Sequence, residues 1–242
     1  MILSLVVQFE WELEQMDIKI AILQGDLEET IFMKQPEGFE DKRGKDLVCK
    51  LKKSLYGLKQ SPRQWNKKFD SFVRGIGFNK SYYDVCLYYE GNNSEDIIIL
   101  LIYVDDMLIA CKSLAKAVNL KKQLSIAFDM TDLGSASKIL RMAIERDKHR
   151  KTLKITQNTY LEKLVDKFGM KNAKPTRIPL AGHFKLSVNL EPVNEEERRY
   201  MKRVPYSSAI GSVMFSMVTS KPDLSYSISV LSRFMSDPKK EH

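Results

Sequence analysis

Three aspartates, Asp17, Asp105 and Asp106, are the residues of this sequence whose type and setting most directly suggest chemistry. Asp105 and Asp106 are adjacent and separate two apolar runs. Carboxylates that meet at one place repel one another unless cations neutralise them, and Mg²⁺ prefers oxygen ligands of this kind. Two such ions can support an in-line phosphoryl displacement. The aspartates are therefore a candidate metal site, although Asp-Asp is also common in turns and spacing alone favours neither interpretation.

The aspartates can meet only if the segments around them form one sheet. Helical spacing of apolar residues predicts a helix over the first dozen residues, which places Asp17 at a helix-to-strand junction. Runs of β-branched and aromatic residues predict strands on both sides of Asp105 and Asp106. These elements predict an α+β fold with a βαββ-like sheet and packed helices. The expected ranges are strands at 84–89, 97–104 and 107–111, a helix at 114–128 and a closing turn at 132–134.

The C-terminal third is predicted to be mostly helical. Lys151–Thr156 has the composition of an edge strand, and Thr156 is the expected cap of a helix that reaches Phe168. The prolines and charges of Lys174–Pro205 are typical of a linker. The segments Tyr206–Met217 and Pro222–Phe234 are expected to form a helical hairpin.

Basic charge is concentrated in one segment. The chain has a formal charge of +8, and Cys49–Lys68 carries seven basic residues and no acidic one. Tyr56 and Trp65 interleave with these residues, which suits a surface where phosphates are neutralised and bases stack. The segment therefore predicts an acidic partner such as nucleic acid, while a solvated helix face is the better interpretation for Lys67 and Lys68.

Other compositional features argue against several classes of protein. Three scattered cysteines without metal-ligand spacing indicate ordinary thiols in a reducing compartment. The longest apolar run, Ile97–Val104, is far shorter than the roughly 20 residues that a membrane helix needs. Met1–Val7 lacks the basic leader and cleavage site of a secretory signal. We therefore expect an intracellular protein that is neither secreted nor embedded in a membrane.

The tetrad Tyr103-Val104-Asp105-Asp106, inside the apolar segment Ile102–Ile109, resembles the reverse transcriptases of copia-type retrotransposons. Further motifs of that family occur in the family's order and cover nearly the whole chain. They are Gln15–Lys19 with Gly25–Leu27, Gln35–Phe39, Lys53–Arg63, Tyr206–Gly211 and Pro222-Asp223.

The resemblance implies roles for particular residues. Asp17, Asp105 and Asp106 would be the catalytic ligands of two Mg²⁺ ions, with Mn²⁺ as the alternative metal. Gly57 would allow close backbone approach in a loop that supports nucleotide and template. The implied contacts are Ile22, Tyr56, Gly57, Lys59, Gln60 and Tyr103 for nucleotide and template, Lys50, Lys52, Lys53 and Arg63 for the nucleic-acid backbone, and Leu140 and Arg141 for the primer grip.

The resemblance also implies an architecture and partners. It implies a right-hand polymerase palm with part of the fingers at 1–150, a thumb-like segment at 151–190, a charged linker at 191–205 and the start of a connection region at 206–242. The N-terminal part of the fingers, a ribonuclease H domain and other Pol polyprotein domains are expected outside this chain. The implied partners are an RNA template, a DNA primer or product and deoxynucleoside triphosphates, in the cytoplasm (within a virus-like particle) or the nucleus.

Two residues depart from the family pattern. Ile22 stands where the family carries an aromatic residue that screens the sugar 2′ position, and Arg141 stands where it usually has a glycine in a tight turn. With the triphosphate-binding residues expected outside the chain, three hypotheses follow: an RNA-directed DNA polymerase, a catalytically inactive nucleic-acid-binding remnant, and a structural relic without activity.

Overall fold

The chain folds into two compact units that together contain antiparallel sheets and helices. This mixture agrees with the predicted α+β class. The computed structural model describes residues 1–41, 47–182, 184, 186–187 and 195–242. Unit 1 comprises Met1–Leu140 and Ile144–Lys154, and unit 2 comprises Arg141–Ala143 and Ile155–His242.

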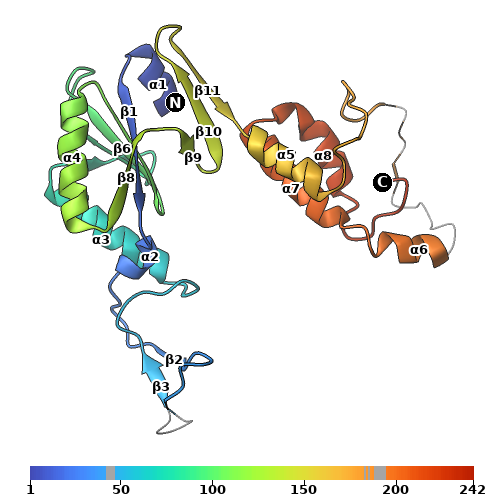
Figure 1. Ribbon diagram of the computed structural model, residues 1–242, viewed down its shortest axis with the longest axis horizontal. Coiled ribbons are helices and arrows are strands. Elements are labelled where there is room, and N and C mark those ends of the chain that lie inside the picture. Colours follow the sequence, from blue (N-terminus) through green and yellow to red (C-terminus); the bar gives the residue numbers. More distant parts are fainter. Residues whose placement is uncertain (42–46, 183, 185, 188–194) are drawn as a thin grey trace. The chain divides into compact units, whose positions relative to one another are not determined.

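A six-stranded antiparallel sheet is the centre of unit 1 (Figure 1). Its strand order, β4-β5-β6-β7-β1-β8, places the N-terminal strand β1 between β7 and β8. The strands expected around the Asp105-Asp106 connection are therefore confirmed as neighbours of the segment that carries Asp17. The bounds are β1 Glu12–Ile18, β4 Asn79–Lys80, β5 Leu87–Glu90, β6 Ile98–Tyr103, β7 Asp106–Cys111 and β8 Met130–Ser135.

Two local predictions in this sheet were wrong. The segment 132–134 is not a closing turn but part of β8, where the register against β1 shifts between Gln15 and Met16. Gly134 takes a left-handed φ of 73° there, and the presence of a glycine for this conformation gave the sequence the composition of a turn. The N-terminal helix α1 spans only Ile2–Gln8, so Asp17 lies inside β1 rather than at a helix-to-strand junction.

The core of unit 1 lies between one face of the sheet and helices α3, Ser61–Gly75, and α4, Leu114–Ala127 (Figure 1). Alternate strand residues such as Met16, Met107 and Leu100 point into it and are fully buried. Trp65, Phe69 and Phe128 form an aromatic group with centroids 5.4 to 5.7 Å apart. Since partners across a strand pair share a face, Asp17 and Asp106 lie on the opposite face from this core.

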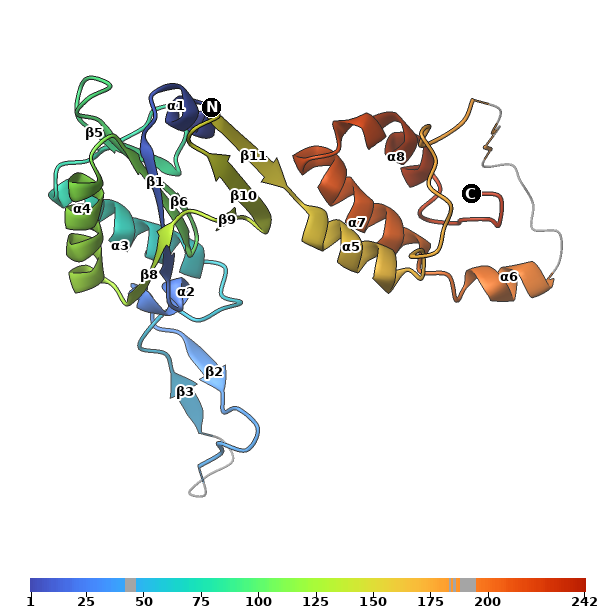
Figure 2. The same cartoon turned by 45° about the horizontal axis from the view of Figure 1, so that its top comes forward.

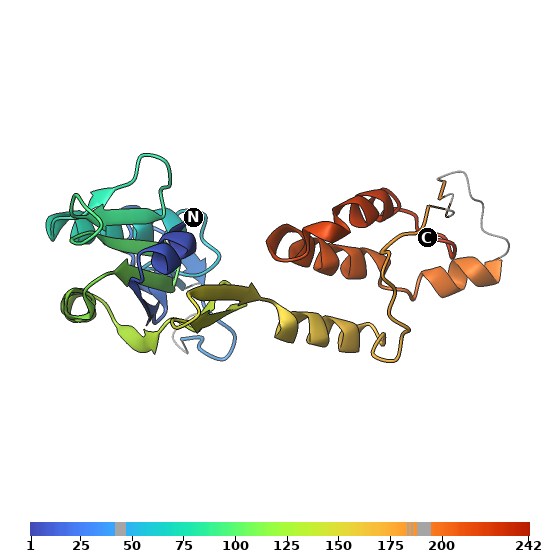
Figure 3. The same cartoon turned by 90° about the horizontal axis from the view of Figure 1, so that it is seen from above.

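Two smaller sheets are also present, and the second of them contains residues of both units. The hairpin of β2, Phe32–Lys34, and β3, Val48–Lys50, follows the short helix α2, Ala21–Gln24 (Figure 2). The second sheet has the order β11-β10-β9, and β10 and β11 run side by side in Figure 3. The predicted edge strand near Thr156 is confirmed as β11. The bounds are β9 Lys138–Ile139, β10 Met142–Asp147 and β11 Thr152–Thr156.

Unit 2 is a helical assembly. Helix α5 is confirmed, but its cap is Gln157 rather than Thr156, and no side chain makes a capping hydrogen bond. The Tyr160 hydroxyl of α5 donates to Ser212 O of α7 at 3.0 Å. The expected hairpin of α7 and α8 is also confirmed, because the Tyr206 hydroxyl donates to Leu231 O at 2.9 Å. The bounds are α5 Asn158–Lys167, α6 Glu195–Met201, α7 Tyr206–Thr219, the 3₁₀ turn η1 Pro222–Leu224 and α8 Ser225–Ser232.

Part of the expected charged linker, residues 191–194, lies outside the described residues, as do 183, 185 and 188–190 of the expected thumb-like segment. Within the rest of the linker the chain forms α6. No helix in the described ranges combines the length and apolar character needed to cross a membrane.

The three cysteines are free thiols, as expected. Cys111 is buried in the core, and Cys49 and Cys86 are half-buried. Burial raises the pKa of the Cys86 and Cys111 thiols, which makes their thiolates harder to form. Neither has the environment of a reactive cysteine.

Candidate active site

The sheet register brings the predicted carboxylates to one place. Asp17 of β1 lies directly opposite Asp106 of β7, and Tyr103 of β6 is paired with Asp106 on its other side. Directly opposed residues in antiparallel strands share a face, with Cβ atoms roughly 4.5–5.5 Å apart. Asp105 lies in the turn beside them, and its carbonyl accepts the Ile18 N–H at 3.0 Å. Residues about ninety positions apart in the sequence thus form one cluster.

The turn that carries Asp105 has an unusual backbone. Val104 has a φ of 58°, and among the four residues Tyr103 to Asp106 it alone has a positive φ. A two-residue hairpin with a positive φ only at its first central residue is a type II′ turn, which normally takes glycine there. Placing a β-branched residue in this conformation costs roughly 1–3 kcal/mol of stability, and surrounding contacts must offset that cost. Here the Trp65 indole Nε1–H donates to the Val104 carbonyl at 3.0 Å.

Mutual repulsion is visible at Asp17. Burial raises the pKa of this carboxyl above its ordinary value, and the negative charges of Asp105 and then Asp106 raise it further. A divalent cation would relieve this repulsion, so the chemistry of the cluster fits a metal site. In the described ranges, however, no three His, Cys, Asp or Glu side chains already converge as a ready-made set of ligands. The cluster has the right donors, without a preformed cage.

A second hairpin contacts the cluster. The Leu140 N–H, at the tip between β9 and β10, donates to Asp106 Oδ2 at 3.3 Å. Leu140 and Arg141 have φ values of 48° and 65°, which defines a type I′ turn. Arg141 therefore occupies the kind of left-handed position at which a glycine was expected. Of the two residues predicted to grip a primer, Leu140 touches the carboxylate cluster.

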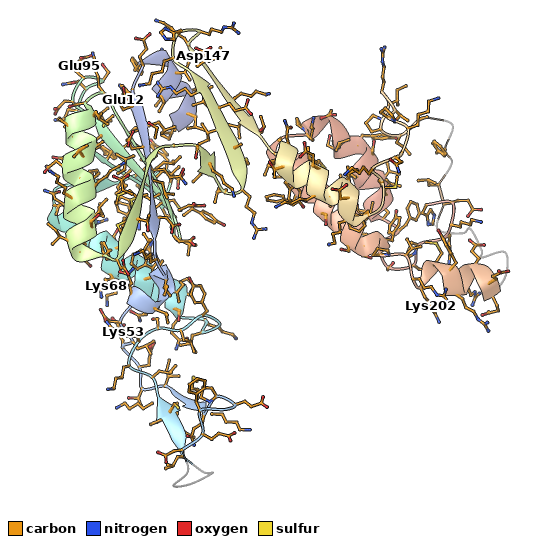
Figure 4. All side chains as sticks on the ribbon, viewed as in Figure 1. Glu12, Lys53, Lys68, Glu95, Asp147 and Lys202 are labelled. Atoms are coloured by element: carbon orange, nitrogen blue, oxygen red, sulfur yellow. The ribbon has the colours of Figure 1, made fainter. Side chains whose placement is uncertain are left out.

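The basic segment is partly neutralised. Lys53 and Lys68 both pair with Asp26, and Figure 4 shows the two lysines near each other. Both lysines lower the pKa of the Asp26 carboxyl. Lys67 likewise pairs with Glu28, in agreement with a solvated role. The exposed residues of the segment without an ion pair in the described ranges are Lys50, Lys52, Lys59 and Arg63.

The predicted nucleotide loop lies within this segment, directly before α3. Tyr56 is 58% exposed, and Gly57 has a φ of 96°. A Cβ at Gly57 would meet no atom of the chain, so within the chain its glycine serves the backbone conformation rather than close packing. Gln60, at the end of the loop, is the N-cap residue of α3. The Ser61 hydroxyl donates to Leu55 O at 2.8 Å and ties the loop to the first turn of this helix.

Close packing behind the loop explains a motif to which sequence reasoning gave no role. A Cβ on Gly25 would lie 3.0 Å from Trp65 N and 3.1 Å from Ser54 Oγ, so only glycine fits without displacement. Ser54 N–H donates to Gly25 O at 3.1 Å. The Gly25–Leu27 motif therefore packs against the Lys53–Arg63 motif at Ser54 and against α3 at Trp65, both distant from it in sequence. The signal was the glycine itself, but its partner could not be identified without the fold.

Two predicted contact residues are buried in the core. Trp65 was expected to stack on bases, but it is 4% exposed and surrounded by Phe69 and Phe128. Ile22, predicted at the sugar-screening position, is also 4% exposed and belongs to the same core cluster. Neither side chain presents a surface to a nucleotide in this structure. Both side chains instead pack into the hydrophobic core around α2 and α3, which the motif alone did not indicate.

Comparison with known proteins gives consistent matches. The sequence profile of the family described as reverse transcriptase (RNA-dependent DNA polymerase) matches residues 1–182. The chain is 51% identical, over 241 residues, to the retrovirus-related Pol polyprotein from transposon TNT 1-94 of Nicotiana tabacum. This match covers all of the chain and 18% of that polyprotein. It is 34% identical over 241 residues to the corresponding polyprotein from transposon RE1 of Arabidopsis thaliana and spans 16% of it.

A shorter relative is covered more fully. Over 228 residues, or 94% of this chain, the sequence is 32% identical to the putative transposon Ty5-1 protein of Saccharomyces cerevisiae, and the match covers 71% of that protein. The similarity therefore includes both units of the fold, while the plant polyproteins are several times longer than this chain.

Proposed function

Because the chain belongs to the reverse transcriptase (RNA-dependent DNA polymerase) family, we propose that it carries the nucleotidyl-transfer site of a copia-type retrotransposon polymerase. The observation that carries this proposal is the register of the central sheet, which sets Asp17 opposite Asp106 and beside Asp105. Unit 1 would be the palm with part of the fingers, and α5 of unit 2 the beginning of a thumb.

Asp17, Asp105 and Asp106 would hold two Mg²⁺ ions, or Mn²⁺ in their place. When bound, the ions would lower the pKa of a primer 3′-hydroxyl and stabilise departing pyrophosphate. The chain itself supplies positioned charge. Burial and then the negative charges of Asp105 and Asp106 raise the pKa of Asp17, and a bound cation would relieve this repulsion. The Leu140 N–H would orient Asp106 by donating to one of its oxygens.

Basic residues without a carboxylate partner among the described residues would contact the substrates. Lys59 precedes α3 and Arg63 lies in its first turn, and both are exposed, so their charges are available to phosphates. Lys50 is the last residue of β3 in the β2–β3 hairpin and Lys52 follows it; both suit the backbone of a template or primer. The remaining domains of a Pol polyprotein would supply the other activities of the element.

Primer extension tests this function. The 242-residue chain should extend a DNA primer on an RNA template with Mg²⁺ and deoxynucleotides, and Asp105→Asn should remove that extension. Asp96→Asn is the matched control, because Asp96 is an exposed aspartate at the opposite end of β6, where it pairs with Lys116. Extension that survives Asp105→Asn, or is absent from the wild-type chain, would overturn the catalytic assignment.

A second candidate is a nucleic-acid-binding chain without catalysis. Lys50, Lys52 and Lys59 favour it, since they are exposed, have no ion pair among the described residues and do not depend on the carboxylates. Binding through phosphates makes log affinity fall linearly with log salt, and each lost contact reduces the slope by about 1. Lys52→Gln and Lys59→Gln should flatten the slope, whereas Lys67→Gln, whose ammonium pairs with Glu28, should not. Binding with these slopes but without extension would favour this candidate.

A further inference from the structure

The strained turn that carries Asp105 has a specific buried anchor. Val104 is 42% exposed and holds a left-handed φ of 58°, so its own side chain has little packing to keep it there. Its carbonyl accepts the Nε1–H of Trp65 at 3.0 Å. Trp65 is itself fixed, since it is 4% exposed and lies edge-on to Phe128 with centroids 5.4 Å apart. The donor is thus rigid and the acceptor is the strained peptide.

We propose that Trp65 is a positioning residue that holds the Val104-Asp105 turn in its type II′ form and thereby sets where Asp105 and Asp106 stand. Trp65 touches no substrate. It acts through the backbone, because the next carbonyl along, Asp105 O, accepts the Ile18 N–H and joins the turn to the strand that carries Asp17. Loss of the indole donor frees one side of the turn and weakens this junction.

The start of helix α3 connects two parts of the proposed site. Ser61, one turn before Trp65 in α3, holds the nucleotide loop through Leu55 O. Gly25 packs against Trp65 N so closely that no side chain fits there. The first two turns of α3 therefore hold the loop at Ser61 and the carboxylate turn at Trp65. This inference rests on the proposed function only for its catalytic consequence; the conformational part stands on the geometry.

The chain contains its own control. Trp11 is 3% exposed, stacks on Phe9 at 5.4 Å and donates its Nε1–H to Ser94 O at 3.1 Å. Ser94 lies in the connection at the opposite end of β6 from Val104. Trp65→Phe and Trp11→Phe therefore each remove one buried indole-to-carbonyl hydrogen bond and keep an aromatic ring, but only the first removes it at the carboxylates.

The test compares the two variants in the 242-residue chain by hydrogen exchange and by Mn²⁺ binding. Trp65→Phe should speed exchange of the Ile18 amide by roughly tenfold, because the Asp105 carbonyl that protects it becomes mobile. It should also weaken Mn²⁺ binding several-fold and lower kcat for primer extension, with KM for primer unchanged. Trp11→Phe should change none of these. Equal Ile18 exchange in the two variants would overturn the proposal.

A reciprocal measurement covers the case in which Trp65→Phe does not fold. Glycine adopts the left-handed φ without strain, so Val104→Gly should slow exchange of the Trp65 indole N–H and leave that of Trp11 unchanged; equal Trp65 exchange in the variant and the wild type would also overturn the proposal. The proposed function fails separately: a wild-type chain that neither extends primer nor binds Mn²⁺ at the turn would reject catalysis, while the Ile18 exchange rates still decide whether Trp65 holds the turn.

Discussion

The two hairpin tips that meet at Asp106 both contain residues with a left-handed backbone, but different contacts hold these residues in place. The β6–β7 tip bends at Val104 and the β9–β10 tip bends at Leu140 and Arg141, and none of these left-handed residues is glycine. The first tip is anchored from the core by Trp65 and from β1 by Ile18. The second is an exposed tip that donates its Leu140 N–H outward, to Asp106.

This difference shows where backbone strain is tied to function. At the β6–β7 tip, buried groups hold Val104 in a conformation that β-branched residues avoid, and the positions of Asp105 and Asp106 depend on that conformation. At the β9–β10 tip, Arg141 is exposed and the strain comes from its backbone alone. We therefore expect changes at the first tip to alter activity and changes at Arg141 to alter mainly local stability.

The largest expected effect is at Asp106, the carboxylate at which both hairpin tips meet. Asp106→Asn should lower kcat for primer extension by about a thousandfold, because a charged metal ligand worth several kcal/mol is lost. The asparagine oxygen can still accept the Leu140 N–H, so the fold should persist. Asp129→Asn is the control, since Asp129 is exposed and pairs with Lys19 at 3.1 Å. A loss of activity as large in the control would show that the effect is not specific to the cluster.

A smaller effect is expected at the second tip. Arg141→Gly should stabilise the β9–β10 hairpin by about 1 kcal/mol, since glycine adopts a positive φ without the steric cost. Exchange of the Ile144 amide reports on this opening, because its N–H donates to Ser137 O at 2.8 Å across the hairpin. Exchange should slow about fivefold. Arg150→Gly, at a turn residue without a positive φ, should speed local exchange, and slowing in both would contradict the argument from strain.

Much of the sheet was predictable because its signals are local. The apolar runs around Asp105 and Asp106 have lengths and compositions that only strands satisfy, and the two-residue connection between them fixes a hairpin. The sequence also indicated that Arg141 occupies a position suited to glycine. By contrast, β8 was missed because Gly134 gives a bulged strand the composition of a turn.

The unpredicted features all depend on contacts between distant segments. Trp65 looked like a base-stacking residue because it follows a basic loop, and only the packing of Phe69 and Phe128 shows that it belongs to the core. Lys53 and Lys68 looked like free cations until the fold brought Asp26 between them. Periodicity identifies which face of an element is apolar, but it does not identify the partner of a polar atom.

The smallest expected effect concerns stability and sharpens the contrast between the tips. The folded chain binds a proton at Asp17 more tightly than the unfolded chain does, because burial and the charges of Asp105 and Asp106 raise its pKa. Ionised Asp17 therefore destabilises the fold, and this loss of stability sets in as the pH rises from the ordinary pKa of 3.8 and is complete above the raised value.

Asp17→Asn should raise Tm at pH 7, with a gain that disappears toward pH 4. Added Mg²⁺ should stabilise the wild type more than the variant. At the β10–β11 turn, Asp147 accepts the Arg150 N–H at 3.0 Å, so Asp147→Asn is a control that should give no gain at pH 7. Thermal melts across this pH range decide the matter, and a gain from Asp17→Asn that does not depend on pH would show that carboxylate repulsion is not its cause.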